Sequence, residues 1–344
     1  MHLMDRALRT LADKGVFIFE EEAKAVTIAI LLHDIGHGPF SHALENILVE
    51  GINHEEISLM LMEALNDEFG NEFSLAIQIF NGTYPKKYLH QLVSGQLDMD
   101  RLDYLSRDSF FSGVHEGTVG YDRIIKMINV HKGRLVVEEK GIYSIEKFLM
   151  ARRLMYWQVY LHKTVLVAEI FLQKIILRAK QLVREGVELS ASPPLKYFLH
   201  NAYNSGSSKQ EFIANYVALD DYDLHTAFKE WQLHDDFILS NLCKRVIDRR
   251  LFKVHLEKKP FDEKVVEGIE KKLLKKYPIK SEDLHYFVFK GEVSNTAYSS
   301  KSAIDIYYKN GQILDIAKAS DHLNIKQLAS PVVKHYLCYP KEIN

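Results

Sequence analysis

Cysteine, long apolar runs and an excess of charge of one sign are all scarce in this sequence of 344 residues. The two cysteines, Cys243 and Cys338, show no CxxC spacing, which excludes a disulfide-stapled scaffold and favours reduced thiols in a cytoplasmic protein. The longest apolar run, residues 26–32, has only seven residues and includes Thr27, so no membrane span of roughly 18–20 residues is expected. Basic and acidic residues number 44 and 46 and leave a net charge of -2, which argues against broad binding to nucleic acid.

A capping residue is also missing at the start of the chain. Residues 1–8 alternate charged and apolar side chains, which is typical of an amphipathic helix and not of a signal peptide. Because nothing before Met1 caps this helix, we expect that the natural chain begins earlier.

The first part of the chain, up to residue 189, is predicted to be a helical core. Residues 23–32 are apolar nearly all round, which predicts a buried central helix. Helical spacing also marks residues 41–50, 54–69 and 74–81, and a long helix is expected over about 145–184. Within residues 133–144 the pattern breaks, and we expect a short hairpin there.

The second part, residues 190–344, is predicted to be a smaller α+β lobe, so the expected fold class is mainly α. The cluster of serines and prolines at 190–194 marks the boundary. Helices are expected to about residue 277, with a solvated charged face at 257–276. Strands are expected at 285–289 and in a hairpin over 304–316, where Asn310-Gly311 suits a type I′ turn. The lysines of 253–276 alternate with acidic residues and have no aromatic platform, which disfavours a nucleic-acid site.

The most informative segment runs from Leu31 to His42. His33 and Asp34 follow an apolar helix, and a divalent metal would satisfy such a pair in a place of low dielectric. Gly36 and Gly38 allow a tight turn, which carries two further histidines. Taken alone, a His–Asp dipeptide is more typical of a structural pair at a helix end, but three histidines within ten residues favour a site.

Two later segments add cations, tyrosines and carboxylates at helical spacing. In residues 96–108, an apolar face lies opposite a stripe that carries Asp100, Tyr104 and Arg107, with Asp108 at its edge. In residues 151–163, Arg152, Tyr156, Tyr160 and Lys163 are predicted to share one stripe. Taken alone, the first segment is more typical of an amphipathic helix with a solvated charged side, and the second of ordinary interface aromatics with solvated cations. Together they suit a triphosphate with a stacked sugar and base.

These three segments resemble the HD phosphohydrolase superfamily, and in particular its deoxynucleoside triphosphate (dNTP) triphosphohydrolase branch, which includes the sterile-alpha-motif/HD-domain enzymes. The resemblance rests on LLHDIGHGPFSHALE at 31–45 with the following His54-Glu55, on QLDMDRLDYLSRDSFFSG at 96–113, and on ARRLMYWQVYLHK at 151–163. The first stretch identifies an HD protein, and the second is more specific to this branch.

The resemblance implies a role for each matching position. The metal ligands would be His33, Asp34 and Asp100. Acid–base or water-positioning roles fall to His37, His42, His54 and Glu55, with Glu45 beside them. The triphosphate would be held by Arg101, Tyr104, Arg152 and Lys163. The sugar and base would contact Asp108, Tyr160 and His162.

The family has a further histidine ligand in an H-x-x-G stretch just before the helix that Met1–Met4 resembles. That histidine would precede residue 1, and His2 does not match its position. The resemblance therefore implies that one of four protein ligands lies outside this sequence. Arg101 is a smaller departure, because lysine is common at that position, and the two cations bind phosphate with different geometry.

The resemblance implies hydrolysis of a dNTP to the deoxynucleoside and inorganic triphosphate. A divalent Mn, Mg, Fe, Ni or Zn ion would polarise the α-phosphate and activate water, with a histidine as acid or base. We expect a homo-oligomer, a dimer or tetramer, with a further allosteric nucleotide. Two alternatives stay open: another HD-type nucleotide phosphohydrolase, and a nucleotide-binding regulatory protein with a defective metal site.

Overall fold

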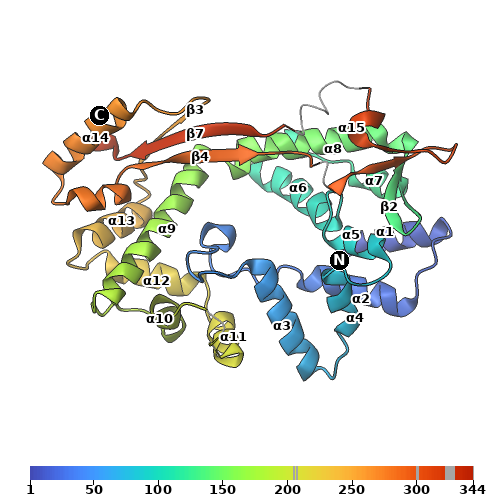
Figure 1. The fold of residues 1–344 in the computed structure, drawn as a ribbon, viewed down its shortest axis with the longest axis horizontal. Helices are drawn as coiled ribbons and strands as arrows, with labels where there is room; N and C mark the ends of the chain where they lie inside the picture. The colour runs from blue at the N-terminus through green and yellow to red at the C-terminus, as the bar shows by residue number, and fades with distance from the viewer. Residues whose placement is uncertain (204–205, 207, 300–301, 322–329, 344) are drawn as a thin grey trace. The chain divides into compact units, whose positions relative to one another are not determined.

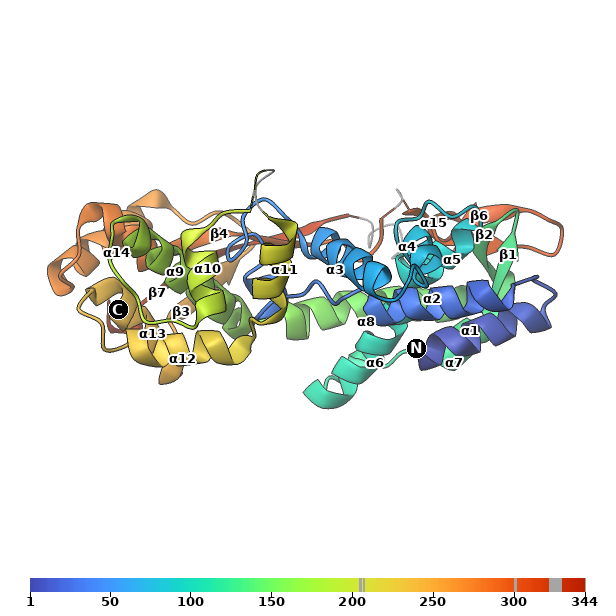
Figure 2. The same ribbon diagram turned by 90° about the horizontal axis from the view of Figure 1, so that it is seen from below.

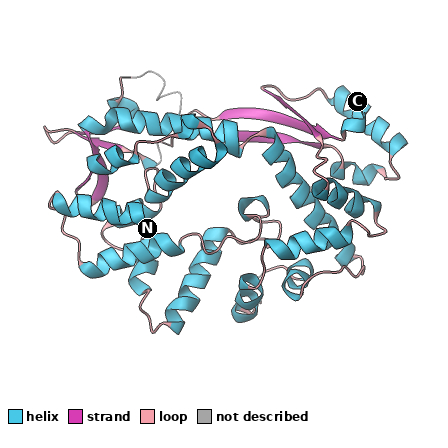
Figure 3. Ribbon diagram, turned by 180° about the vertical axis from the view of Figure 1, so that it is seen from behind, coloured by secondary structure: helices cyan, strands magenta, loops and turns pink. Residues whose placement is uncertain are grey.

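The computed structural model describes residues 1–203, 206, 208–299, 302–321 and 330–343. Helices dominate, and the strands, magenta in Figure 3, form two small sheets, which confirms the mainly α fold class. The chain divides into two compact units. The first unit comprises Met1–Ile35, Ser58–Tyr160 and Ser294–Val332, and the second comprises Gly36–Ile57, Leu161–Val293 and Val333–Asn344. The boundary expected near residue 190 stays a prediction.

The first unit is built on helices that share one apolar core (Figure 1). α1 buries Leu3, Ala7 and Leu11 at the spacing of an amphipathic helix, and it packs beside α2 (Figure 2). The helices are α1 His2–Asp13, α2 Glu20–Leu32, α3 His54–Glu68, α4 Ser74–Phe80, α5 Lys87–Val93, α6 Met99–Ser112, α7 Tyr121–Met127, α8 Ile142–Met155 and the short α15 Ile316–Ala319. The helices expected at 54–69 and 74–81 are thereby confirmed.

A sheet with the order β1-β2-β5-β6 completes the first unit. Its strands are β1 Ile128–His131, β2 Arg134–Glu138, β5 Asp305–Tyr307 and β6 Ile313–Asp315. The hairpin expected around Asn310-Gly311 is confirmed by the antiparallel pairing of β5 with β6. The hairpin expected at 133–144 begins earlier, because Lys132 and Gly133, with φ of 49° and 76°, form its turn.

The second unit packs helices against a sheet with the order β3-β7-β4. Its helices are α9 Lys163–Arg184, α10 Pro193–His200, α11 Lys209–Val217, α12 Asp221–Trp231, α13 Phe237–Ile247 and α14 Glu263–Lys276. Its strands are β3 Lys253–Glu257, β4 Phe289–Asn295 and β7 Val332–Tyr339. The last two residues of β4 and the first residue of β7 are assigned to the first unit. α14 buries Val266, Ile269 and Leu273 and leaves its lysines outward, as expected for a solvated charged helix.

Four sequence-based expectations are wrong. Residues 41–50 form only a 3-10 turn at Ser41–Ala43, and the long helix expected over 145–184 is interrupted. A π-helical turn at Tyr156–Tyr160 separates α8 from α9. Where a strand was expected at 285–289, a 3-10 helix, Ser281–Tyr286, ends and β4 starts only at Phe289. β3 lies where only helices were expected.

The α2 helix is also less central than its composition predicts. Its inner side buries Ala25, Val26, Ala29 and Ile30, whereas Leu31 is 55% exposed. Elsewhere, Cys243 and Cys338 are both buried free thiols. None of the helices in the described ranges is long and apolar enough to cross a membrane.

Candidate active site

His33 lies at the end of α2 beside two carboxylates of the first unit. Its Nδ1 is 2.9 Å from the carbonyl oxygen of Ile30, a contact that favours the tautomer with the proton on Nδ1 and the lone pair on Nε2. Nε2 lies 3.2 Å from Asp34 Oδ2 and 3.7 Å from Asp100 Oδ1. Burial lowers the pKa of His33, but Asp100 and Asp34 outweigh it and raise that pKa, so the position favours a cation.

The ligand atoms of His33, Asp34 and Asp100 all lie within 4.8 Å of one another. The convergence expected from the sequence is therefore present, although Asp100 comes from the first turn of α6. His33 Nε2 is buried and makes no hydrogen bond to any residue that the structure describes. A buried nitrogen without a hydrogen bond, next to two carboxylates, fits a divalent metal that would bind all three groups.

The α6 helix carries the next group of candidates. Asp98 caps it by accepting a hydrogen bond from the backbone N–H of Arg101 at 2.7 Å. The guanidinium of Arg101 also contacts the carboxylate of Asp98 and the carbonyl of Gly95. Some of the N–H groups of Arg101 are therefore already bonded at the start of α6, which leaves fewer of them for a ligand than the sequence predicts.

Arg152, on α8, is a cation whose guanidinium has N–H groups available for a ligand. Its Nε and Nη1 are buried and find no hydrogen-bond partner among the described residues. Its Cζ lies 5.9 Å from the ring centre of Tyr156, a cation–π contact that orients the guanidinium. Burial and Tyr156 raise the pKa of Tyr104, although Arg152 and Arg101 lower it. Tyr104 therefore lies close to both cations and stays neutral.

Asp108 and Tyr160 form a hydrogen-bonded pair in the first unit. The Tyr160 hydroxyl donates to Asp108 Oδ2 at 2.6 Å, and burial together with this carboxylate raises the pKa of Tyr160. The Tyr160 ring meets the rings of Tyr104 and Tyr156 edge-on, at 6.1 and 5.2 Å. The π-helical turn places Tyr160 here, as such turns often do at functional sites.

His162 and Lys163 belong to the second unit. His162 is exposed and caps α9, its Nδ1 accepting from the backbone N–H of Thr164 at 3.3 Å. Lys163 is the exposed first residue of the same helix. The single stripe expected from Arg152 to Lys163 is therefore wrong, because the helix ends and restarts between them.

His37, His42 and His54 form a histidine cluster in the second unit, and each offers a ring nitrogen within 4.8 Å of the others. The rings of His37 and His54 stack with centres 4.2 Å apart, and His42 meets them edge-on at 4.5 and 5.2 Å. The turn before the cluster is strained, because Phe40 and Ser41 have φ of 54° and 45°.

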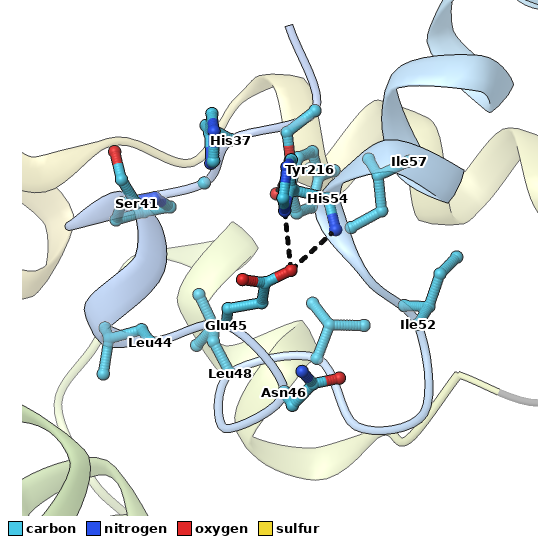
Figure 4. A pocket seen from close by; sticks show the side chains of 14 residues that line it. His37, Ser41, Leu44, Glu45, Asn46, Leu48, Ile52, His54, Ile57 and Tyr216 are labelled. Atoms are coloured by element: carbon cyan, nitrogen blue, oxygen red, sulfur yellow. Dashed lines mark hydrogen bonds and ion pairs between the residues drawn. The ribbon is translucent and has the colours of Figure 1, made fainter. Parts of the chain in front are cut away.

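Glu45 is the carboxylate that contacts this histidine cluster, and Figure 4 shows it bonded to His54. Its Oε1 lies 2.7 Å from His54 Nδ1 and accepts the backbone N–H of His54 at 3.1 Å, while its Oε2 lies 3.3 Å from His42 Nδ1. Burial raises the pKa of Glu45, but the bonds from His54 and His42 outweigh it and lower that pKa to about 2. Glu55, the carboxylate assigned from the sequence, is exposed at the start of α3.

Tyr216, on α11, was not foreseen. Its hydroxyl donates to the carbonyl of Gly36 at 2.7 Å, and it lines a pocket with His37, Glu45 and His54 (Figure 4). A Cβ on Gly38 would lie 2.8 Å from that hydroxyl. Gly38 therefore permits the contact, but Tyr216 is 180 positions from Gly36, and no local pattern could have predicted it.

Comparisons with known proteins identify the family of this chain. The HD domain family matches residues 3–108, and the HD associated region matches residues 119–189. YwfO of Bacillus subtilis is 30% identical over 94% of this chain and 75% of its own length. A solved phosphohydrolase from Bacteroides thetaiotaomicron is 53% identical, with a TM-score of 0.92 over 98% of this chain and 84% of that chain.

A more distant relative carries a named activity. The Dictyostelium discoideum homologue of SAMHD1, a deoxynucleoside triphosphate triphosphohydrolase, is 29% identical over 42% of this chain and 32% of its own length. The extent of the similarity to YwfO and to the Bacteroides phosphohydrolase, with the HD domain match, establishes the family. This chain belongs to the HD-domain phosphohydrolase superfamily.

Proposed function

We propose that this chain hydrolyses a deoxynucleoside triphosphate to the deoxynucleoside and inorganic triphosphate. In this reaction the oxygen of water bonds to the α-phosphorus, the bond from that phosphorus to the sugar oxygen breaks, and the sugar oxygen takes a proton. The SAMHD1 homologue, a deoxynucleoside triphosphate triphosphohydrolase similar over 42% of this chain, supports this choice of substrate.

The observation that carries the proposal is the guanidinium of Arg152. Two of its buried nitrogens have no hydrogen-bond partner in the described ranges of the chain, and such a state is costly unless a ligand binds there. Arginine binds phosphate oxygens through paired donors, so an anionic phosphate is the ligand that suits it. Tyr104 and Arg101 lie close to it, and α6 joins them to Asp100.

The metal ligands in this proposal are His33, Asp34 and Asp100. A divalent metal bound there would supply Lewis acidity at the phosphate to be hydrolysed. The Ile30 carbonyl fixes the His33 ring, and the Ser58 hydroxyl donates to the carbonyl of His33 at 2.8 Å. The first bond holds the imidazole in one orientation, which a ligand residue requires, and the second holds the backbone of His33.

The remaining roles follow the family resemblance. Asp108 would accept a hydrogen bond from a sugar hydroxyl, and Tyr160, held by Asp108, would exclude a 2′-hydroxyl by its bulk. A member of the histidine cluster would supply or remove the proton, since imidazole serves either role near neutral pH. Lys163 and His162 stay proposed contacts of the phosphates and of the base.

The test is product analysis with the full chain, Mn²⁺ or Mg²⁺ and each of the four dNTPs. Phosphorus NMR distinguishes inorganic triphosphate from pyrophosphate and phosphate, and chromatography identifies the deoxynucleoside. Equal amounts of triphosphate and deoxynucleoside would support the proposal. Release of phosphate from nucleoside monophosphates, with dNTPs untouched, would instead identify another HD-type phosphohydrolase. Tight dNTP binding without any turnover would identify a regulatory nucleotide-binding protein.

A further inference from the structure

We propose that the histidine cluster, His37, His42 and His54, is a binding site for a second divalent ion of the zinc type, separate from the group at His33. Its donors are three imidazole nitrogens from two separated stretches of chain, a turn at 37–42 and the start of α3. Their mutual separations, all within 4.8 Å, leave room for one ion at ligand distances of about 2.0–2.1 Å, once one of the stacked rings of His37 and His54 turns toward it.

Glu45 gives this site the outer contacts that zinc ligands usually have. In metal sites, a histidine ligand commonly gives its other ring N–H to a carboxylate, which fixes the ring and its tautomer. Glu45 lies at hydrogen-bond distance from Nδ1 of His54, at 2.7 Å, and near Nδ1 of His42, at 3.3 Å. With Nδ1 as the donor on both rings, Nε2 is the nitrogen that binds the ion.

The charge around the cluster also favours a cation. The two carboxylate oxygens of Glu45 face two of the three rings, at 2.7 Å from His54 Nδ1 and 3.3 Å from His42 Nδ1. Glu169, a half-buried residue of α9, interacts with the charge of His42. A divalent ion among the histidines would therefore meet negative charge in a partly dry place, where attraction is stronger than in water.

The space beside the cluster suits an ion better than a nucleotide. The pocket lined by His37, Glu45 and His54 has a volume of about 30 Å³, far below the roughly 300–1,000 Å³ of a typical small-molecule site. Its walls are fixed, because Tyr216 holds the Gly36 carbonyl at 2.7 Å and the Gln173 side chain donates to the Ala43 carbonyl at 3.0 Å.

Nitrogen ligands decide which ion binds. Imidazole suits zinc, copper, nickel and iron, whereas magnesium and calcium prefer oxygen ligands. A site of three histidines whose rings are hydrogen-bonded to a carboxylate is therefore a zinc-type site. The group of His33 with two carboxylates also accepts ions that prefer oxygen ligands, such as magnesium. This inference does not depend on the proposed substrate. If the proposed function is also right, zinc at the cluster removes the proton donor, so excess zinc inhibits turnover.

The experiment measures metal binding without any nucleotide. Zn²⁺ is titrated calorimetrically into the metal-stripped full chain, and Co²⁺ absorption reports the geometry of the bound ion. The double variant His33→Ala/Asp34→Asn disables the first group and is expected to keep one Zn²⁺ per chain. Adding His42→Ala, a change of a side chain that is 69% exposed, is expected to abolish this binding. Glu45→Gln is expected to weaken it about 10–100-fold.

The matched control is His200→Ala, an exposed histidine on α10 in the same unit, which should leave zinc binding unchanged. Should the double variant fail to fold, the comparison is made without it. The wild-type chain is then expected to bind two zinc ions, and the single variant His42→Ala is expected to bind one. The proposal is overturned if zinc binding is absent in the double variant, or persists undiminished after His42→Ala. Neither result depends on dNTP hydrolysis, so a failure of the proposed function would be seen separately.

Discussion

Arg152 combines a full positive charge with buried donors that have no partner among the described residues. Arg152→Ala is expected to weaken dNTP binding about 10–100-fold, because a hydrogen bond to a charged group contributes about 1.5–3 kcal/mol. The same change should leave the melting temperature equal or higher, since it removes an unsatisfied buried charge. Calorimetry with a non-hydrolysable dNTP analogue and a thermal melt measure the two effects.

Arg153→Ala is the matched control, because it removes the same side chain from the next position of α8. It should leave dNTP affinity near the wild-type value. A loss of affinity that is equal in both variants would show that Arg152 acts through general charge and not as a phosphate ligand.

Gly38 and Tyr216 form a close contact that can be tested as a pair. Gly38→Ala should destabilise the protein, because the new Cβ would lie 2.8 Å from the Tyr216 hydroxyl. Tyr216→Phe should cost about 1–2 kcal/mol through loss of the buried hydrogen bond to Gly36. In the double variant the two losses should be less than additive, since phenylalanine lacks the atom that clashes. Denaturant melts of all four proteins would measure this; strict additivity would contradict the close contact.

At the scale of elements, α9 and α13 are joined by a buried ion pair. Arg178 donates to both carboxylate oxygens of Asp236, at 3.1 and 2.6 Å, and Asp236 also caps α13 through the Leu239 N–H at 2.7 Å. Both side chains are largely buried, with 11% and 16% exposed. Asp236→Asn should destabilise the protein by about 3 kcal/mol, because it removes the carboxylate that Arg178 bonds directly and leaves only Asp283, at 3.9 Å, to balance the buried charge.

The pH dependence of this effect has a definite sign. Burial raises the pKa of Asp236, but the bonds from Arg178 outweigh it and hold the pKa below its usual 3.8. A carboxylate whose pKa is lower in the folded than in the unfolded protein makes its full contribution to stability at pH values above the unfolded pKa. It loses this contribution as the pH falls through the folded pKa. The melting difference between wild type and Asp236→Asn should therefore be constant above about pH 5 and shrink below about pH 4. Asp235→Asn, an exposed neighbour, should show no such pattern.

Elements with strong local chemistry could be predicted from the sequence, and those fixed by distant contacts could not. Asn310-Gly311 predicted its hairpin because both residues tolerate positive φ. The strained turn at Phe40 and Ser41 could not be predicted, because these residue types rarely adopt positive φ. β3 alternates polar residues with only two apolar ones, Val254 and Leu256, a pattern too short to predict a strand, and its pairing with β7 along residues 335–339 defines it.

The same distinction holds for the candidate site. His33, Asp34 and Asp100 were identifiable because metal chemistry restricts the residue types that bind, and their convergence needed only that α2 and α6 meet. The pairing of Glu45 with His54 was not identifiable, because sequence position favoured the adjacent Glu55. Geometry decides here, since the Glu45 oxygen lies 2.7 Å from the His54 ring.

At the scale of the whole molecule, the first unit needs a late segment of the chain. β2 pairs in parallel with β5, and Ile304, Ile306 and Ile316 lie in the same apolar core as α1 and α2. A chain of residues 1–189 is therefore expected to lose cooperative folding, because the sheet and core lack these residues. Circular dichroism melts and limited proteolysis against the full chain would test this. A sharp melt of the shortened chain would instead support the boundary predicted near residue 190.

The two buried thiols give the second unit a built-in reporter of its own opening. Cys243 on α13 and Cys338 on β7 are fully buried, and burial raises the pKa of the Cys338 thiol to about 12. Thiol reagents attack the exposed thiolate, so labelling has to wait until the surrounding structure opens. The labelling rates at the two positions therefore report how often a helix and a strand of this unit separate from their neighbours, on the slow timescale of local unfolding.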